Sequence, residues 1–207
     1  MKIVIRVFCL LLLAQMLLQA GDYRIKIVPV RPIESYPMQT TVDGITIAAN
    51  PYSTDRDSAQ AFDVKNLNSR GYFPVHVIIK NGTSSYLTIR TRNVLLFTPD
   101  GNQLYATSAA IVVDKVIKSG LTQKTPKEIE TELGKTGSPL IDFTSKELVT
   151  ASIDPGAVID GFLFFFTTDK KNLFDGSSLY IPRLEEEGTR KPFGPFTIKL
   201  STAAPKK

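Results

Sequence analysis

The chain has 207 residues, a formal net charge of +5 and a single cysteine. Its 25 basic residues are scattered among 20 acidic ones, so the sequence offers no continuous basic surface for nucleic acid. With one histidine and only Cys9 as a thiol, a transition-metal site built from several imidazoles or thiolates is excluded, and no cofactor is expected.

Residues 1–20 have the pattern of a secretory signal peptide. Residues 7–18 are apolar except for Gln15, and a small residue, Ala20, ends the segment. A membrane-spanning helix needs about 20 apolar residues, so we expect cleavage after Ala20, with a retained anchor as the alternative. Cys9 lies inside the apolar run, where lipoprotein processing does not use it. The sequence therefore predicts an exported protein, periplasmic or secreted, with no stable membrane span after cleavage and no internal disulfide.

Most of the chain after the leader carries the signals of short antiparallel strands. Tyr23, Ile25 and Ile27 alternate with basic residues and predict a first strand. Asp43-Gly44 accepts the positive φ angles of a tight hairpin between Val42 and Ile45. Further strands are expected at residues 75–80, 86–90, 94–98, 103–106, 157–167, 178–181 and 196–200. Turn-forming residues 81–85 predict a hairpin between strands 75–80 and 86–90. Turn-forming residues 99–101 predict another between strands 94–98 and 103–106.

Helical signals lie between the strands. Ser53-Thr54 predicts a cap for a short helix that ends near residue 62. Residues 109–118 place four apolar residues on one stripe and predict an amphipathic helix. Thr125-Pro126 begins a third helix, which Gly134 ends.

These elements predict a single domain over residues 21–200 of the mainly β class. We expect an immunoglobulin-like antiparallel β-sandwich with a partly helical insert at about residues 107–145. Residues 201–207 are expected to form a disordered tail.

Two stretches carry a family resemblance. Residues 47–81, with the step Pro51-Tyr52 and a strand ending at Asn81, resemble a group of uncharacterised secreted bacterial proteins. Residues 154–165, an Asp-Pro-Gly turn followed by an apolar strand, are similar to secreted immunoglobulin-like domains that act as binding or assembly modules. The resemblance covers about a third of the chain and implies the sandwich fold and a binding or assembly role.

The residues that could carry chemistry mostly have structural interpretations. His76 alternates with two valines, so we expect an exposed histidine on a sheet face, with no triad partners nearby in the sequence. Asp55-Arg56-Asp57 and residues 169–175 lack the ligand spacing of a calcium loop, and the first cluster is expected to stabilise a helix start. Ser84-Ser85, Ser177-Ser178 and the charged run 185–191 are interpreted as turns and a solvated loop.

Residues 162–166 are the most concentrated apolar segment. On a strand, Phe162, Phe164 and Phe166 share one face, whereas Leu163 and Phe165 share the other. We expect one face to fill the sandwich core and the insert to cover the other, with an exposed docking patch as the alternative.

The function expected from the sequence is that of a non-enzymatic binding or assembly module. Its partner would be an envelope or extracellular protein, bound through an edge strand or the insert. The alternative is a carboxylate-dependent hydrolase with a cleft between insert and sheet, which needs two acids from distant segments. No catalytic, cofactor-binding, metal-binding or partner-binding residue is assigned.

Overall fold

The computed structural model describes residues 23–117, 139–169 and 173–202. The predicted leader, the predicted helix at 125–134 and the last five residues of the predicted tail lie outside these residues. In the described part of that tail, Ser201 N donates to Met38 Sδ and Thr202 N donates to Asp175 Oδ1 over 2.6 Å, and the disordered tail itself stays a prediction. None of the described helices is long and apolar enough to cross a membrane.

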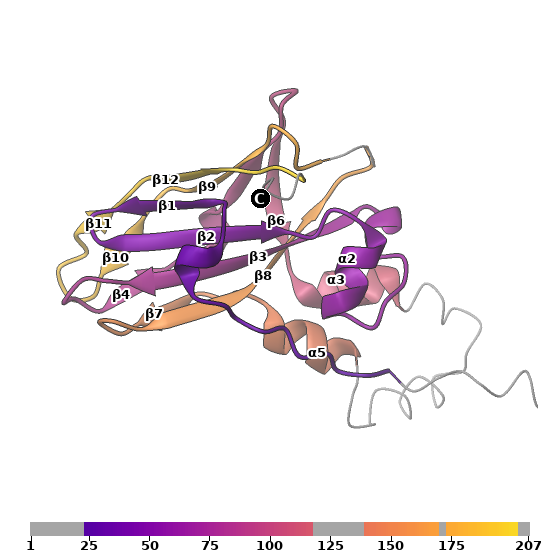
Figure 1. Cartoon of the computed structure of the whole chain (residues 1–207), viewed down its shortest axis with the longest axis horizontal. Coiled ribbons are helices and arrows are strands. Elements are labelled where there is room, and N and C mark those ends of the chain that lie inside the picture. Colours follow the sequence, from indigo (N-terminus) through magenta and orange to yellow (C-terminus); the bar gives the residue numbers. More distant parts are fainter. Residues whose placement is uncertain (1–22, 118–138, 170–172, 203–207) are drawn as a thin grey trace, which may run out of the picture.

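The fold is mainly antiparallel β-structure, arranged in two sheets (Figure 1). The larger sheet has the order β1 (Gln39–Val42), β2 (Ile45–Pro51), β3 (Tyr72–Asn81), β8 (Val158–Phe166), β6 (Gln103–Thr107), β5 (Leu95–Phe97), β9 (Ser178–Ile181) and β12 (Phe196–Lys199). It curls until β1 and β12 lie side by side, which makes it a nearly closed barrel. The smaller sheet has the order β11 (Pro192–Phe193), β10 (Leu184–Glu186), β4 (Leu87–Ile89) and β7 (Ala151–Ile153).

Most predicted strands are present, and the β1–β2 hairpin is confirmed. Val42 pairs with Ile45, and Asp43 and Gly44 between them have φ angles of 51° and 80°. The hairpin between β5 and β6 is also confirmed. β7, β10 and β11 were not predicted, and β10 and β11 flank a hairpin where the sequence indicated only a solvated loop. The specifically immunoglobulin-like arrangement stays a prediction.

The predicted hairpin between β3 and β4 is wrong, because the chain passes from one sheet to the other there. β3 pairs with β2 and β8, whereas β4 pairs with β10 and β7. The buried Asn81 fixes this crossing. Its amide nitrogen donates to the carbonyls of Ser85, Ile153 and Asp154, and its amide oxygen accepts from Thr83 N. The side chain therefore takes the place of the backbone ladder that a hairpin would have.

The predicted strand at residues 23–27 is also wrong. These residues are extended but belong to neither sheet, because no neighbouring strand offers them a hydrogen-bonding ladder. We call residues 23–32 the strap. It leads into the 3₁₀ turn η1 (Ile33–Ser35), whose Ile33 and the following Tyr36 pack on Ala48 and Ile78 of the larger sheet.

The main core lies between the two sheets. Leu163 and Phe165 of β8 are buried there with Val75 of β3, Leu87 of β4 and Leu184 of β10. The opposite face of β8 is covered by three helices, α2 (Asp55–Ala61), α3 (Ala109–Val116) and α5 (Pro139–Lys146) (Figure 1).

Phe162 and Phe164 are buried beneath these helices, as predicted for the insert, while Phe166 at the strand end is 44% exposed. α2 follows the predicted cap, with Thr54 and Asp57 forming a capping box. Two further 3₁₀ turns, η2 (Asn68–Arg70) and η3 (Thr91–Asn93), complete the described elements. Gly161 lets the chain after α5 approach the sheet, since a Cβ there would lie 2.7 Å from the backbone of Leu148.

Candidate binding pocket beneath the strap

His76 lies on the outer face of the larger sheet, as its alternation with the valines of β3 predicts. It is only 1% exposed, however, so the prediction of an exposed histidine is wrong. The physical reason is that the strap and the segment around α2 cover this face, which the sequence pattern of β3 cannot show. Phe162 is the register partner of His76 on β8, and the two rings stack with centroids 4.7 Å apart.

A carboxylate holds one nitrogen of the His76 ring. Nε2 lies 2.7 Å from Oδ2 of Asp160, which is two residues before Phe162 on β8 and therefore on the same face. The Asp160 side chain is 40% exposed. Nδ1 of His76 makes no hydrogen bond with any residue that the structure describes. The pair thus fixes the ring and leaves its second nitrogen to the cavity that His76 lines.

This cavity, the strap pocket, has a volume of about 250 Å³. The strap forms one wall, and the other walls come from the sheet and from the segment around α2. Its lining residues are Ile27, Val28, Pro29, Arg31, Tyr36, Asn50, Tyr52, Gln60 and His76. It therefore combines apolar and aromatic side chains with polar ones, and it opens to solvent beside Ile27, which is 90% exposed.

Two tyrosines and an arginine give the strap pocket its chemistry. The guanidinium carbon of Arg31 lies 4.6 Å from the ring centroid of Tyr36, and Arg31 N donates to the Tyr36 hydroxyl over 3.2 Å. Tyr52 meets Phe162 edge-on at 5.3 Å. Burial, followed by the nearby Tyr36 and Asp57, raises the pKa of Tyr52, so its hydroxyl stays neutral and can donate.

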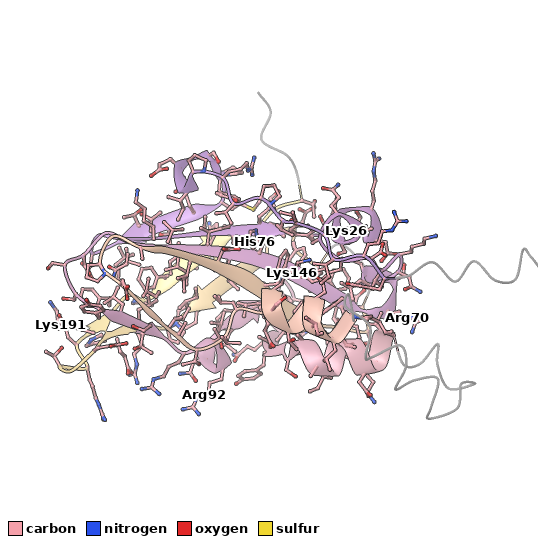
Figure 2. The ribbon with its side chains drawn as sticks, turned by 90° about the horizontal axis from the view of Figure 1, so that it is seen from below. Lys26, Arg70, His76, Arg92, Lys146 and Lys191 are labelled. Carbon is pink, nitrogen blue, oxygen red and sulfur yellow. The ribbon has the colours of Figure 1, made fainter. Side chains whose placement is uncertain are left out.

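The strap is held over this pocket by side chains. Tyr23 OH donates to Asp142 of α5 over 2.5 Å, and Lys26 Nζ donates to the Ala59 carbonyl of α2. Lys26 also pairs with Asp63 at 3.4 Å. Figure 2 labels Lys26 and Lys146 towards the end of the molecule where the helices lie, and His76 over the strands. The strap therefore docks without the backbone ladder of a strand.

The anchor at Asp142 is a buried charged group. Asp142 is fully buried, and Lys146 Nζ lies 2.5 Å from its second carboxylate oxygen. Lys146 also donates to the Ala61 carbonyl over 2.7 Å and lies over the Phe62 ring. Burial, and then the hydrogen bond to Asp142, raise the pKa of Tyr23 well above its usual range, so it serves as a neutral donor.

The other residues considered in the sequence do not gather at the strap pocket. Asp57 caps α2, and Asp55 accepts from the backbone of Asn68 and Ser69. Ser85 Oγ donates to Glu186, and Ser177 Oγ donates to the Leu173 carbonyl. Within residues 23–117, 139–169 and 173–202, no group of three histidine, cysteine or acidic side chains is placed to hold a metal ion.

Sequence reasoning missed the strap pocket because its residues come from four separate segments. His76 drew attention as the single histidine, and Tyr52 through the step Pro51-Tyr52 in the family resemblance. Nothing in the strap indicates that Arg31 meets Tyr36 or that Val28 lies near His76. The alternation of basic and apolar residues at 23–27 was the one available signal for the strap. It was interpreted as a strand, although residues 23–27 belong to neither sheet.

Comparisons with known proteins give weak similarities. No family model matches the chain, and no curated protein matches it. YcdA, a proposed lipoprotein of Bacillus subtilis, aligns with a TM-score of 0.40 and 15% identity over 78% of this chain and 38% of its own. YjhA of B. subtilis aligns with a TM-score of 0.40 and 8% identity, over 70% of this chain and 79% of its own. A functionally unknown protein of Listeria monocytogenes EGD-e gives a TM-score of 0.37 and 12% identity, over 78% and 80%. This chain thus spans less than half the length of YcdA.

Proposed function

We propose that the chain is an exported, non-enzymatic binding module of the cell envelope or extracellular space that holds a small ligand in the strap pocket. The observation that carries the proposal is His76, a buried side chain with one nitrogen bonded to Asp160 and the other left to a cavity. A histidine that a carboxylate orients and that lines a cavity can offer its second ring nitrogen to a small molecule.

The walls of the strap pocket support the same role. Tyr52 offers an aromatic surface for a ligand, and the amides of Asn50 and Gln60 offer both donors and acceptors. The cavity has room for several waters or for one small organic molecule. Recognition of a protein partner through an edge strand or the insert, as expected from the sequence, stays a prediction.

The hydrolase alternative needs two acids in a cleft between the insert and the sheet. In the described part of the insert, Phe143 packs directly on Phe164, with ring centroids 5.6 Å apart. Asp142 is engaged by Lys146, and Glu147 accepts from Ala109 N over 3.1 Å. These contacts favour a binding role. The alternative is tested by assaying the purified mature chain for turnover of ester and polysaccharide panels, and turnover that survives purification would overturn the non-enzymatic assignment.

A fragment titration tests the strap pocket as the binding site. The chain from Gly21 would be titrated with a panel of small aromatic fragments, and binding followed by chemical shifts of the Ile and Val methyl groups. His76→Phe keeps a ring on Phe162 and removes both nitrogens, and Tyr52→Phe removes one hydroxyl. Tyr86→Phe, at an exposed tyrosine on β4's flank, is the matched control.

We expect fragments to shift the methyl groups of Ile27 and Val28, and each pocket variant to weaken binding by about tenfold while the control does not. Binding that is unchanged in both pocket variants would place the site elsewhere. A panel that shifts none of the pocket methyl groups would equally overturn the proposal. Export is checked separately, by finding whether the protein isolated from outside the cytoplasm begins at Gly21.

A further inference from the structure

We infer that the strap pocket selects a small carboxylate with a flat apolar body, and that Arg31 binds the carboxylate. This inference rests on the proposed function and names the ligand class. It follows from the charges around the cavity, from the guanidinium of Arg31 and from the residues that form the walls.

Arg31 is the cation available to a ligand in the strap pocket. Lys26, on the same segment, is paired with Asp63, and Lys80 of β3 is paired with Glu34 at 2.9 Å. No carboxylate in the described part of the chain forms an ion pair with Arg31. Its guanidinium instead lies on the Tyr36 ring, which fixes the plane of the group and leaves its N–H fork to a ligand.

The geometry of the guanidinium favours a carboxylate as the anion. The planar fork of an arginine matches the two oxygens of a carboxylate. A dianion such as phosphate fits this site less well, because Arg31 offers a single positive charge and the Asp160 carboxylate lies on the other side of His76. One positive group facing the cavity therefore fits one negative charge.

His76 shapes the polar end of the strap pocket. Asp160 holds its Nε2, so the orientation of the ring that lines the pocket is fixed. Stacking on Phe162 and the bond to Asp160 hold the ring before a ligand arrives, so little side-chain entropy is lost on binding.

The rest of the lining fits an apolar body rather than a second charged group. Val28, Pro29 and the rings of Tyr36 and Tyr52 form its walls. The volume of about 250 Å³ has room for a body the size of a single ring or a short branched chain. Benzoate combines these properties and is the probe we choose.

The test compares three probes of one shape and different charge: benzoate, neutral benzamide and cationic benzylamine. Each is titrated into the mature chain and followed by the pocket methyl shifts and by calorimetry, with inorganic phosphate as a fourth arm. We expect benzoate to bind at least about tenfold more tightly than benzamide, and benzylamine and phosphate not to compete with it.

Two charge-matched variants locate the effect. Arg31→Gln is expected to reduce benzoate binding to the level of benzamide and to leave benzamide unchanged. Arg24→Gln removes the same charge from the strap at a residue outside the pocket lining, and is expected to change benzoate binding less than twofold. Thermal unfolding of both variants controls for loss of the strap.

The outcomes separate this inference from the proposed function. If benzamide, benzylamine or phosphate binds in the strap pocket as tightly as benzoate, the carboxylate assignment is wrong and the pocket remains a binding site. The same holds if Arg24→Gln weakens benzoate as much as Arg31→Gln does. If neither these probes nor the fragment panel shifts the pocket methyl groups, both the ligand class and the proposed function fail.

Discussion

The two faces of β8 are buried in different ways. The inner face, with Leu163 and Phe165, packs into a core of apolar side chains contributed by both sheets. The outer face, with Phe162 and Phe164, is equally buried, but buried polar side chains lie around it. These are His76, which bonds the partly exposed Asp160, Ser58 with Asn68, and Asp142 with Lys146.

The two faces of β8 differ because different elements cover them. Two sheets can close over an apolar core because their backbone groups are paired within each sheet. Short helices and the strap have ends and extended stretches whose polar groups need other partners, and side chains such as Lys26 and Lys146 supply them. The outer face therefore combines apolar packing with specific polar contacts. The strap pocket, which the buried His76 lines, lies on this face.

The largest expected effect breaks the inner core. Phe165→Ala should lower the free energy of unfolding by about 3–5 kcal/mol, because it removes a fully buried ring and leaves a cavity between the sheets. Phe166→Ala, one residue further along the same strand and 44% exposed, is the control and should lower it by about 1 kcal/mol. Urea unfolding measures both. Equal losses would mean that the two sheets do not share one core.

Breaking the buried ion pair of the outer face should have the next largest effect. Lys146→Met leaves the Asp142 carboxylate buried without its counter-ion and should lower the free energy of unfolding by about 3 kcal/mol. Lys115→Met on the exposed surface of α3 should change it by less than about 0.5 kcal/mol. The double variant Asp142→Asn, Lys146→Met should be more stable than Lys146→Met alone. A double variant of lower stability would show that packing of the lysine stem, and not the charge, carries the effect.

A neutral hydrogen bond of the outer face should contribute less. Ser58 Oγ donates to Asn68 Oδ1 over 2.6 Å, and Asn68 Nδ2 donates to the Tyr52 carbonyl, so this bond supports one wall of the strap pocket. Ser58→Ala should lower the free energy of unfolding by about 1–2 kcal/mol by leaving a buried amide oxygen unpaired. The exposed Ser84→Ala is the control in the same urea titration. If both variants unfold at the wild-type midpoint, the bond contributes nothing.

The smallest effect concerns the rim of the inner core, at the β10–β11 hairpin. Hydrogen bonds from Ser85 and Thr189 hold the pKa of Glu186 below its usual value of 4.5. A lowered pKa stabilises the fold above pH 4.5, and this contribution is lost as the pH falls through the lower folded value. Ser85→Ala should therefore reduce the loss of stability between pH 6 and pH 3. The urea midpoint at several pH values measures it, and parallel curves for variant and wild type would contradict the assignment.

Local signals in the sequence predicted much of the strand framework. Asp43-Gly44 predicted its hairpin because a two-residue turn depends only on its own φ angles. Thr54 predicted a helix start for a similar reason, since a cap bonds within four residues. The crossing of the chain from one sheet to the other at Asn81 could not be predicted, because the Asn81 side chain bonds carbonyls about seventy residues away in the sequence.

The candidate site was missed for the same physical reason. Period-two alternation correctly placed His76 opposite its neighbouring valines, but it does not show whether a face is covered. Burial of His76 depends on the strap and on the loop before α2, and neither follows from the residues around position 76. The strap itself was interpreted as a strand because an extended chain with alternating side chains has that pattern whether or not a neighbouring strand exists.

The approach of β1 to β12 has a consequence for self-association. In an open sheet, the two outermost strands present unsatisfied amide and carbonyl rows that can recruit another copy end to end, which is a route to fibres. Here the rims of the larger sheet face each other, and Met38, just before β1, receives the Ser201 amide from the chain that follows β12. A second copy could therefore add a strand at these edges only if β1 and β12 first separated.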